Sequence, residues 1–178
     1  MLKITVLMVF VFFAAVFAQN GPLAKLPPDP GAAGKKTVLG IDSDGDGVRD
    51  DIQIEVTKLI PNDPYARAGA MFWFAMQQER YKAYVENPNE SFEFFYPYFM
   101  GSGAGAWYCI KTGAADLIPI ERRLIMLLNI KERYFVDQEI GRIANGKMIR
   151  TYNYYPELKE MYDRRFKEFY EREKERQK

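Results

Sequence analysis

Aspartates alternate with serine or glycine near the start of the folded part of the chain, at Asp42, Asp44 and Asp46, and a fourth follows at Asp50. Carboxylates placed so closely repel one another unless positive groups lie among them. Gly47 stands where such a segment has to turn sharply, and glycine tolerates backbone conformations that other residues avoid. The spacing therefore predicts a tight loop whose carboxylates point to one centre.

This spacing matches the ligand pattern of a twelve-residue calcium loop running from residue 42 to residue 53. Calcium is a hard cation that takes about six to eight oxygen ligands. A merely solvated acidic turn would require neither the strict odd spacing nor the glycine at position six, so Ca²⁺ is the predicted cofactor. The predicted ligands are the side chains at positions one, three, five, nine and twelve and the carbonyl at position seven: Asp42, Asp44, Asp46, Asp50, Gln53 and Val48.

Residues 42–53 resemble the DxDGDGxxDD loop shared by EF-hand-like sites of exported proteins, including thrombospondin type 3 repeats and dockerin-like modules. The resemblance is limited to these residues and extends to neither of those folds. It implies four aspartate side-chain ligands and a carbonyl ligand from Val48.

The loop departs from the EF-hand pattern in two places. Gln53 offers one amide oxygen where an EF-hand glutamate binds with two, so we expect a lower affinity, or help from Glu55 or a water molecule. Arg49 stands where paired EF-hands have an apolar residue, and no second DxDxDG segment occurs in the chain. A single calcium loop with one exiting helix is therefore predicted.

Residues 1–18 have the pattern of a secretory signal peptide. Lys3 gives a positive start, residues 4–17 are apolar apart from Thr5, and small residues lead to a predicted cleavage after Ala18. An uncleaved membrane anchor usually takes about 20 apolar residues, and this run is shorter. We expect an exported protein, periplasmic or extracellular, with no transmembrane segment after cleavage. The source stays open, and Asn89 is a glycosylation acceptor only on a eukaryotic secretory route.

Residues 19–36 are rich in proline and glycine, which indicates a disordered or semi-rigid linker. Residues 37–178 are predicted to form a single domain, mainly α, built as a bundle of about five to six helices with the calcium loop near its N-terminal end. Strand signals are sparse, and the best of them, 147–155, is expected to be a loop or a short extended piece. Helices are predicted over 50–60, 63–84, a region from 87 that Pro97 kinks or divides, 117–128, 129–145 and 156–176.

The composition excludes several functional classes. The chain has no histidine, so His-based triads and zinc sites of the histidine type are excluded. It has one cysteine, Cys109, which excludes an internal disulfide. Cys109 is predicted to be a buried small hydrophobe, the alternative being a disulfide to a second chain. A formal net charge of +1 argues against a nucleic-acid partner.

Three further segments allow a functional interpretation beside a structural one. The aromatic residues between 92 and 99 favour core packing over a glycan-binding platform, because phenylalanines outnumber tyrosines. Residues 101–106 are small and favour close helix packing or a tight bend over a phosphate loop, since no Gly-Lys-Ser/Thr follows and no buried strand precedes. The charged residues of 157–178 are eight basic and seven acidic, which is typical of a solvated helix face.

The leading prediction is an exported calcium-binding protein in which a single EF-hand-like loop stabilises a helical domain. The alternative is a cell-envelope or extracellular interaction module that uses the aromatic cluster or the last helix to hold a protein or cell-wall partner. We predict no catalytic residues. A carboxylate hydrolase would need two facing acids, and no spacing singles out such a pair among Glu79, Glu121, Glu132 and Glu139.

Overall fold

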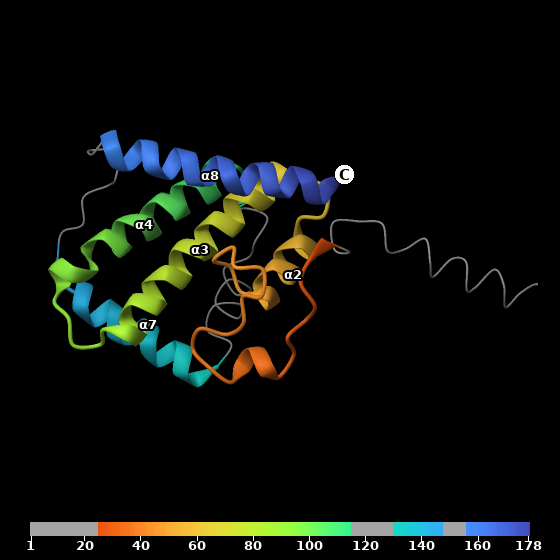
Figure 1. Cartoon of the computed structure of the whole chain (residues 1–178). Coiled ribbons are helices and arrows are strands. Elements are labelled where there is room, and N and C mark those ends of the chain that lie inside the picture. Colours follow the sequence, from red (N-terminus) through yellow and green to blue (C-terminus); the bar gives the residue numbers. More distant parts are fainter. Residues whose placement is uncertain (1–24, 115–129, 148–155) are drawn as a thin grey trace, which may run out of the picture.

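The computed structural model describes residues 25–114, 130–147 and 156–178. These ranges contain five α-helices and no strand, which confirms the predicted mainly α fold (Figure 1). The predicted signal peptide, the predicted helix over 117–128 and most of the segment 147–155 lie outside the described residues. The helices are α2 (Asp50–Leu59), α3 (Pro64–Glu86), α4 (Phe92–Lys111), α7 (Lys131–Ala144) and α8 (Pro156–Gln177).

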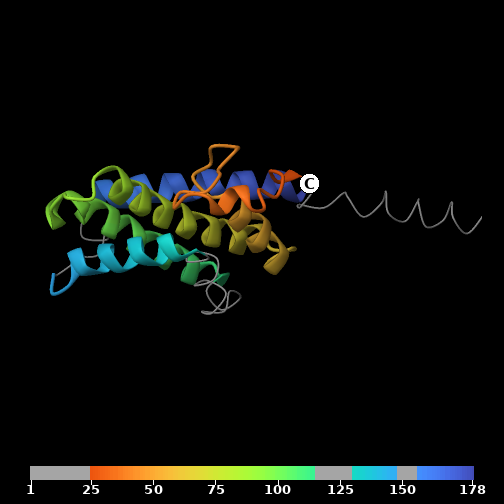
Figure 2. The same cartoon turned by 90° about the horizontal axis from the view of Figure 1, so that it is seen from below.

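The helices α3 and α4 form the central pair of the bundle. In two views at right angles, α7 and α8 lie on opposite sides of this pair (Figures 1 and 2). Pro97 lies inside α4, which runs unbroken through it. Among the described helices, none combines the length and the apolar character that a membrane crossing requires.

The start of α3 follows from two adjacent residues. Asp63 is the N-cap, and its Oδ1 accepts hydrogen bonds from the amides of Tyr65 and Ala66, both at 2.9 Å. Pro64 occupies the first helical position, where its missing N–H costs nothing. The cap and the proline together confirm the predicted helix start.

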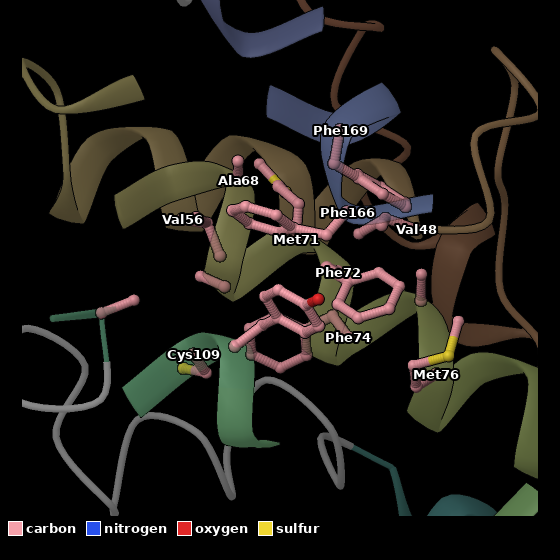
Figure 3. Close-up of a cluster of buried hydrophobic side chains, with 14 of the residues drawn as sticks. Val48, Val56, Ala68, Met71, Phe72, Phe74, Met76, Cys109, Phe166 and Phe169 are labelled. Atoms are coloured by element: carbon pink, nitrogen blue, oxygen red, sulfur yellow. The ribbon is translucent and has the colours of Figure 1, made fainter. Parts of the chain in front are cut away.

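The larger apolar core gathers around Phe72 of α3. Its ring lies 5.2 Å from that of Tyr108 of α4 and 5.8 Å from that of Phe169 of α8, measured between centroids. The loop contributes Val48 to the same cluster (Figure 3). Cys109 is also buried there, as predicted, and a disulfide to a second chain would need it at the surface. The core thus joins α3, α4, α8 and the end of the acidic loop.

Small residues of α4 allow it to approach α3 closely, which is one of the two alternatives predicted for residues 101–106. A Cβ atom added at Gly105 would lie 2.9 Å from Trp73 Cα, a backbone atom that cannot move aside independently. A Cβ atom added at Gly103, on the same helix, would meet nothing within 4 Å. Gly105 is therefore required by the packing of two helices, and Gly103 is not.

The segment before the loop is held against the bundle by an arginine of α7. Arg133 donates to the carbonyls of Gly34 (2.7 Å), Thr37 (3.1 Å) and Val38 (2.8 Å), and its side chain is buried. Gly34 belongs to a short 3₁₀ helix, η2 (Ala33–Lys35), inside the predicted linker. Residues 33–38 are thus anchored where they lead into the loop.

Replacing Gly105 with alanine is expected to lower the free energy of unfolding by about 1–3 kcal/mol, because the added methyl group overpacks the α3–α4 contact. The matched change Gly103→Ala should raise it by up to about 1 kcal/mol through helix propensity alone. Urea denaturation followed by circular dichroism measures both. Stabilisation by Gly105→Ala equal to that by Gly103→Ala would contradict the close contact.

Candidate metal centre

The acidic loop is closed by hydrogen bonds between its own carboxylates and amides. The Asp42 carboxylate accepts from the amide of Asp46 at 3.1 Å and from that of Gly47 at 2.9 Å. Asp46 Oδ1 accepts from the Val48 amide at 2.8 Å. The turn needs positive φ angles of 70° at Gly45 and 87° at Gly47, which glycine adopts readily. The predicted sharp turn is therefore present.

The loop is joined directly to the start of α2 through Asp50, the first residue of the helix. Asp50 Oδ1 accepts from the Ser43 amide at 2.9 Å, and the Asp50 amide donates to the Ile41 carbonyl at 2.9 Å. A carboxylate in the first turn also interacts favourably with the positive end of the helix. The position of Asp50 therefore couples the geometry of the loop to that of α2.

Three of the predicted ligands come together. Asp42, Asp44 and Asp50 each offer a carboxylate oxygen, and these oxygens all lie within 4.8 Å of one another. Oxygens that bind one calcium ion each lie about 2.3–2.6 Å from it, so two of them are at most about twice that distance apart. The separations of these three oxygens are within that limit.

The fourth aspartate, Asp46, faces α8 instead. Its Oδ2 lies 2.8 Å from Arg172 Nη1 and 3.6 Å from Arg176 Nη2, yet this oxygen accepts no hydrogen bond of ordinary geometry. Only 3% of its side chain is exposed. Burial, followed by the neighbouring charge of Asp44, raises the pKa of Asp46 to about 6, against the opposing effects of the hydrogen bond from the Val48 amide and of the two arginines. Its charge is thus poorly compensated in this arrangement.

Gln53, at position twelve, is buried and turned toward both the loop and α8. Its Nε2 donates to Asp44 Oδ1 at 3.1 Å and to the Val48 carbonyl at 3.2 Å. Its Oε1 accepts from Arg176 Nη2 at 3.0 Å. The amide nitrogen, not the oxygen, therefore faces two other predicted ligands. Glu55, the predicted substitute, has its carboxylate 3.8 Å from Lys58 Nζ.

Arg176 connects the loop to a buried ion-pair network. Its Nη2 lies 2.9 Å from Asp44 Oδ2, and its Nη1 lies 2.6 Å from Glu173 Oε1. Glu173 Oε2 also accepts from Arg67 Nε at 2.7 Å, and Arg67 Nη1 donates to the Ile60 carbonyl at 2.9 Å. Arg67 and Glu173 are at most 1% exposed. The prediction that the charged residues of the last helix are solvated is wrong for Glu173 and Arg176.

Arg172 and Arg176 are the two residues of this site that the spacing within the loop does not indicate. A signal for Arg176 was present in the periodicity of the last helix. The apolar stripe that contains Phe166 and Phe169 continues at helical spacing to Glu173 and then to Arg176. Charged residues that extend an apolar stripe are candidates for burial with a partner.

The structure also describes most of the other residues that the sequence offered as functional candidates. In the aromatic cluster, Phe95 and Phe99 are buried and contribute to a smaller core with Ile140 of α7. Among the acids, Glu79 forms an ion pair with Arg165 and Glu139 forms one with Arg142. Glu121 lies outside the described residues.

Comparisons with protein-family models, with curated proteins and with solved structures found no match to this chain. Its function therefore has to be inferred from its own residues.

The buried network predicts that Glu173→Gln lowers the free energy of unfolding by about 3–5 kcal/mol, because Arg67 and Arg176 lose the charge that they share. Chemical denaturation measures this loss. Glu168→Gln removes the same charge from an exposed position of α8 and should change stability by less than about 0.5 kcal/mol. Equal denaturation midpoints for the two variants would show that the buried ion-pair network adds nothing to the stability of the folded protein.

Proposed function

We propose that residues 42–53 bind one calcium ion, and that this ion stabilises the helical domain of an exported protein. The observation that carries the proposal is the convergence of Asp42, Asp44 and Asp50 to within 4.8 Å. All three offer carboxylate oxygens at odd positions of the loop, and hard oxygen ligands favour calcium over softer metals. Export is proposed from the sequence of residues 1–18 alone.

The electrostatics of the loop support a cation as its natural partner. Burial is the main cause that raises the pKa of Asp42 and of Asp46, and the charge of Asp44 raises both further. Each of these effects disfavours the ionised carboxylates in the folded protein. A divalent cation among them would offset the repulsion and the loss of hydration.

A structural role for the ion follows from what the loop touches. Val48 is completely buried in the main core, and Asp50 begins α2. Fixing the carboxylates of the loop on an ion would therefore also fix α2 and one wall of the core. Binding to the folded chain but not to the unfolded chain adds to stability by mass action. The interaction-module alternative stays a hypothesis.

Calcium at about 100 times its dissociation constant should add about 2.7 kcal/mol to the stability of the folded protein. For a domain of this size, that is a rise of about 5–10 °C in the melting temperature relative to protein in a chelator. Differential scanning calorimetry with calcium, with magnesium and with the chelator alone measures the shift. Equal melting temperatures in calcium and in chelator would refute the proposal.

The variant Asp42→Asn should abolish most of the calcium-dependent shift, because it removes the charge of the ligand at position one. Asp29→Asn is the matched control. Asp29 lies outside the loop, and its Oδ1 accepts from the Gly31 amide at 2.8 Å, which an asparagine oxygen also accepts. A shift that is lost equally in both variants would place calcium somewhere other than this loop.

A further inference from the structure

The acidic loop is contacted by positive side chains from the far end of the chain. Arg176 donates to Asp44 Oδ2 across 132 positions of sequence, and it also donates to Gln53 Oε1. Arg172, one helical turn earlier on α8, lies against Asp46. Two guanidinium groups thus contact three of the residues that are predicted to hold calcium, namely Asp44, Asp46 and Gln53.

We propose that Arg172 and Arg176 act as an internal cation for the loop, and that calcium displaces them from it. This inference rests on the proposed function and adds a way in which calcium binding would be regulated. Calcium binding and the docking of residues 172–177 of α8 onto the loop oppose each other. A carboxylate oxygen that accepts a charge-assisted hydrogen bond from arginine has to give it up, or share it, when it binds an ion.

Asp44 is the point at which the two cations meet. One of its oxygens belongs to the group within 4.8 Å of Asp42 and Asp50, and its Oδ2 lies 2.9 Å from Arg176 Nη2. A calcium ion there would place two cations, the ion and the guanidinium, on one carboxylate. Their mutual repulsion favours the departure of the guanidinium, because the ion has more ligands to hold it.

Gln53 makes the exchange possible at position twelve. With Arg176 present, its Oε1 accepts from the guanidinium and its Nε2 faces Asp44 and the Val48 carbonyl. An amide nitrogen cannot bind a cation. Once Arg176 has left, rotation of the amide brings Oε1 toward the loop centre, where it serves as the twelfth-position ligand. Arg176 therefore controls whether Gln53 is a ligand.

The rest of the network tolerates this exchange. Glu173 keeps Arg67 as a partner at 2.7 Å when Arg176 moves, so the buried Glu173 carboxylate is not left without a charge. Arg172 is 39% exposed and reaches solvent by a rotation of its side chain. The change is thus confined to residues 172–177 of α8, while Phe166 and Phe169 stay in the core.

Removal of the two arginine charges should strengthen calcium binding. We expect Arg172→Gln/Arg176→Gln to lower the calcium dissociation constant by about tenfold, within the range of about 5- to 150-fold that is usual for coupled sites. Isothermal titration calorimetry of the full chain with calcium chloride measures it. Arg164→Gln is the matched control, since Arg164 is an exposed arginine of the same helix.

The outcomes separate this inference from the proposed function. Tighter binding in the double variant but not in Arg164→Gln supports competition. Equal affinity in the double variant and the control, or weaker binding in the double variant, overturns competition while calcium binding stands. If neither the unaltered chain nor either variant binds calcium, the proposed function itself is refuted, and competition with it. Should the double variant not fold, Arg172→Gln alone decides, because the Arg172 side chain is more exposed than that of Arg176.

Hydrogen exchange of the unaltered chain gives an independent readout. Calcium should speed amide exchange in residues 172–177, which lose their links to the loop, and slow it in residues 42–53. Slower exchange in both segments would show that the ion and the arginines hold the loop together rather than compete, and would overturn the inference.

Discussion

The connection between the acidic loop and the last helix depends on the contacts of one side chain, the guanidinium of Arg176. It lies between the Asp44 carboxylate, the Gln53 amide and the Glu173 carboxylate, and therefore joins the acidic loop, α2 and α8. Glu173 extends the connection to Arg67 near the start of α3. The contacts of Arg176 with Gln53 and Glu173, and that of Glu173 with Arg67, are buried, so each charge there depends on its partner for the solvation that water would otherwise provide.

Charge is distributed in this chain so that a near-neutral total conceals strong local fields. The aspartates of the loop are concentrated within a few residues, and their first compensation comes from the amides of the loop, such as that of Gly47 on Asp42. The second comes from Arg172 and Arg176 of α8. The neighbouring segment shows the same dependence, because the buried Arg133 is satisfied by the carbonyls of Gly34, Thr37 and Val38.

Much of the fold was predictable because it depends on local periodicity. The Asp63 cap, the buried middle of α3 and the close contact at Gly105 all follow from residues near one another in the sequence. The convergence of Asp42, Asp44 and Asp50 followed from their odd spacing around a turning glycine.

The two arginines of the site could not be derived in this way, because a contact across 132 positions depends on how α8 packs against α3. The orientation of Gln53 was hidden for the same reason, since Arg176 determines it. Competition between calcium and Arg176 is tested most directly by NMR observation of the Arg176 side chain and the Gly47 amide during one calcium titration. Both signals are predicted to shift with the same midpoint, as Arg176 leaves Asp44 when the ion enters the loop. A shift of Gly47 with Arg176 unchanged would contradict this account.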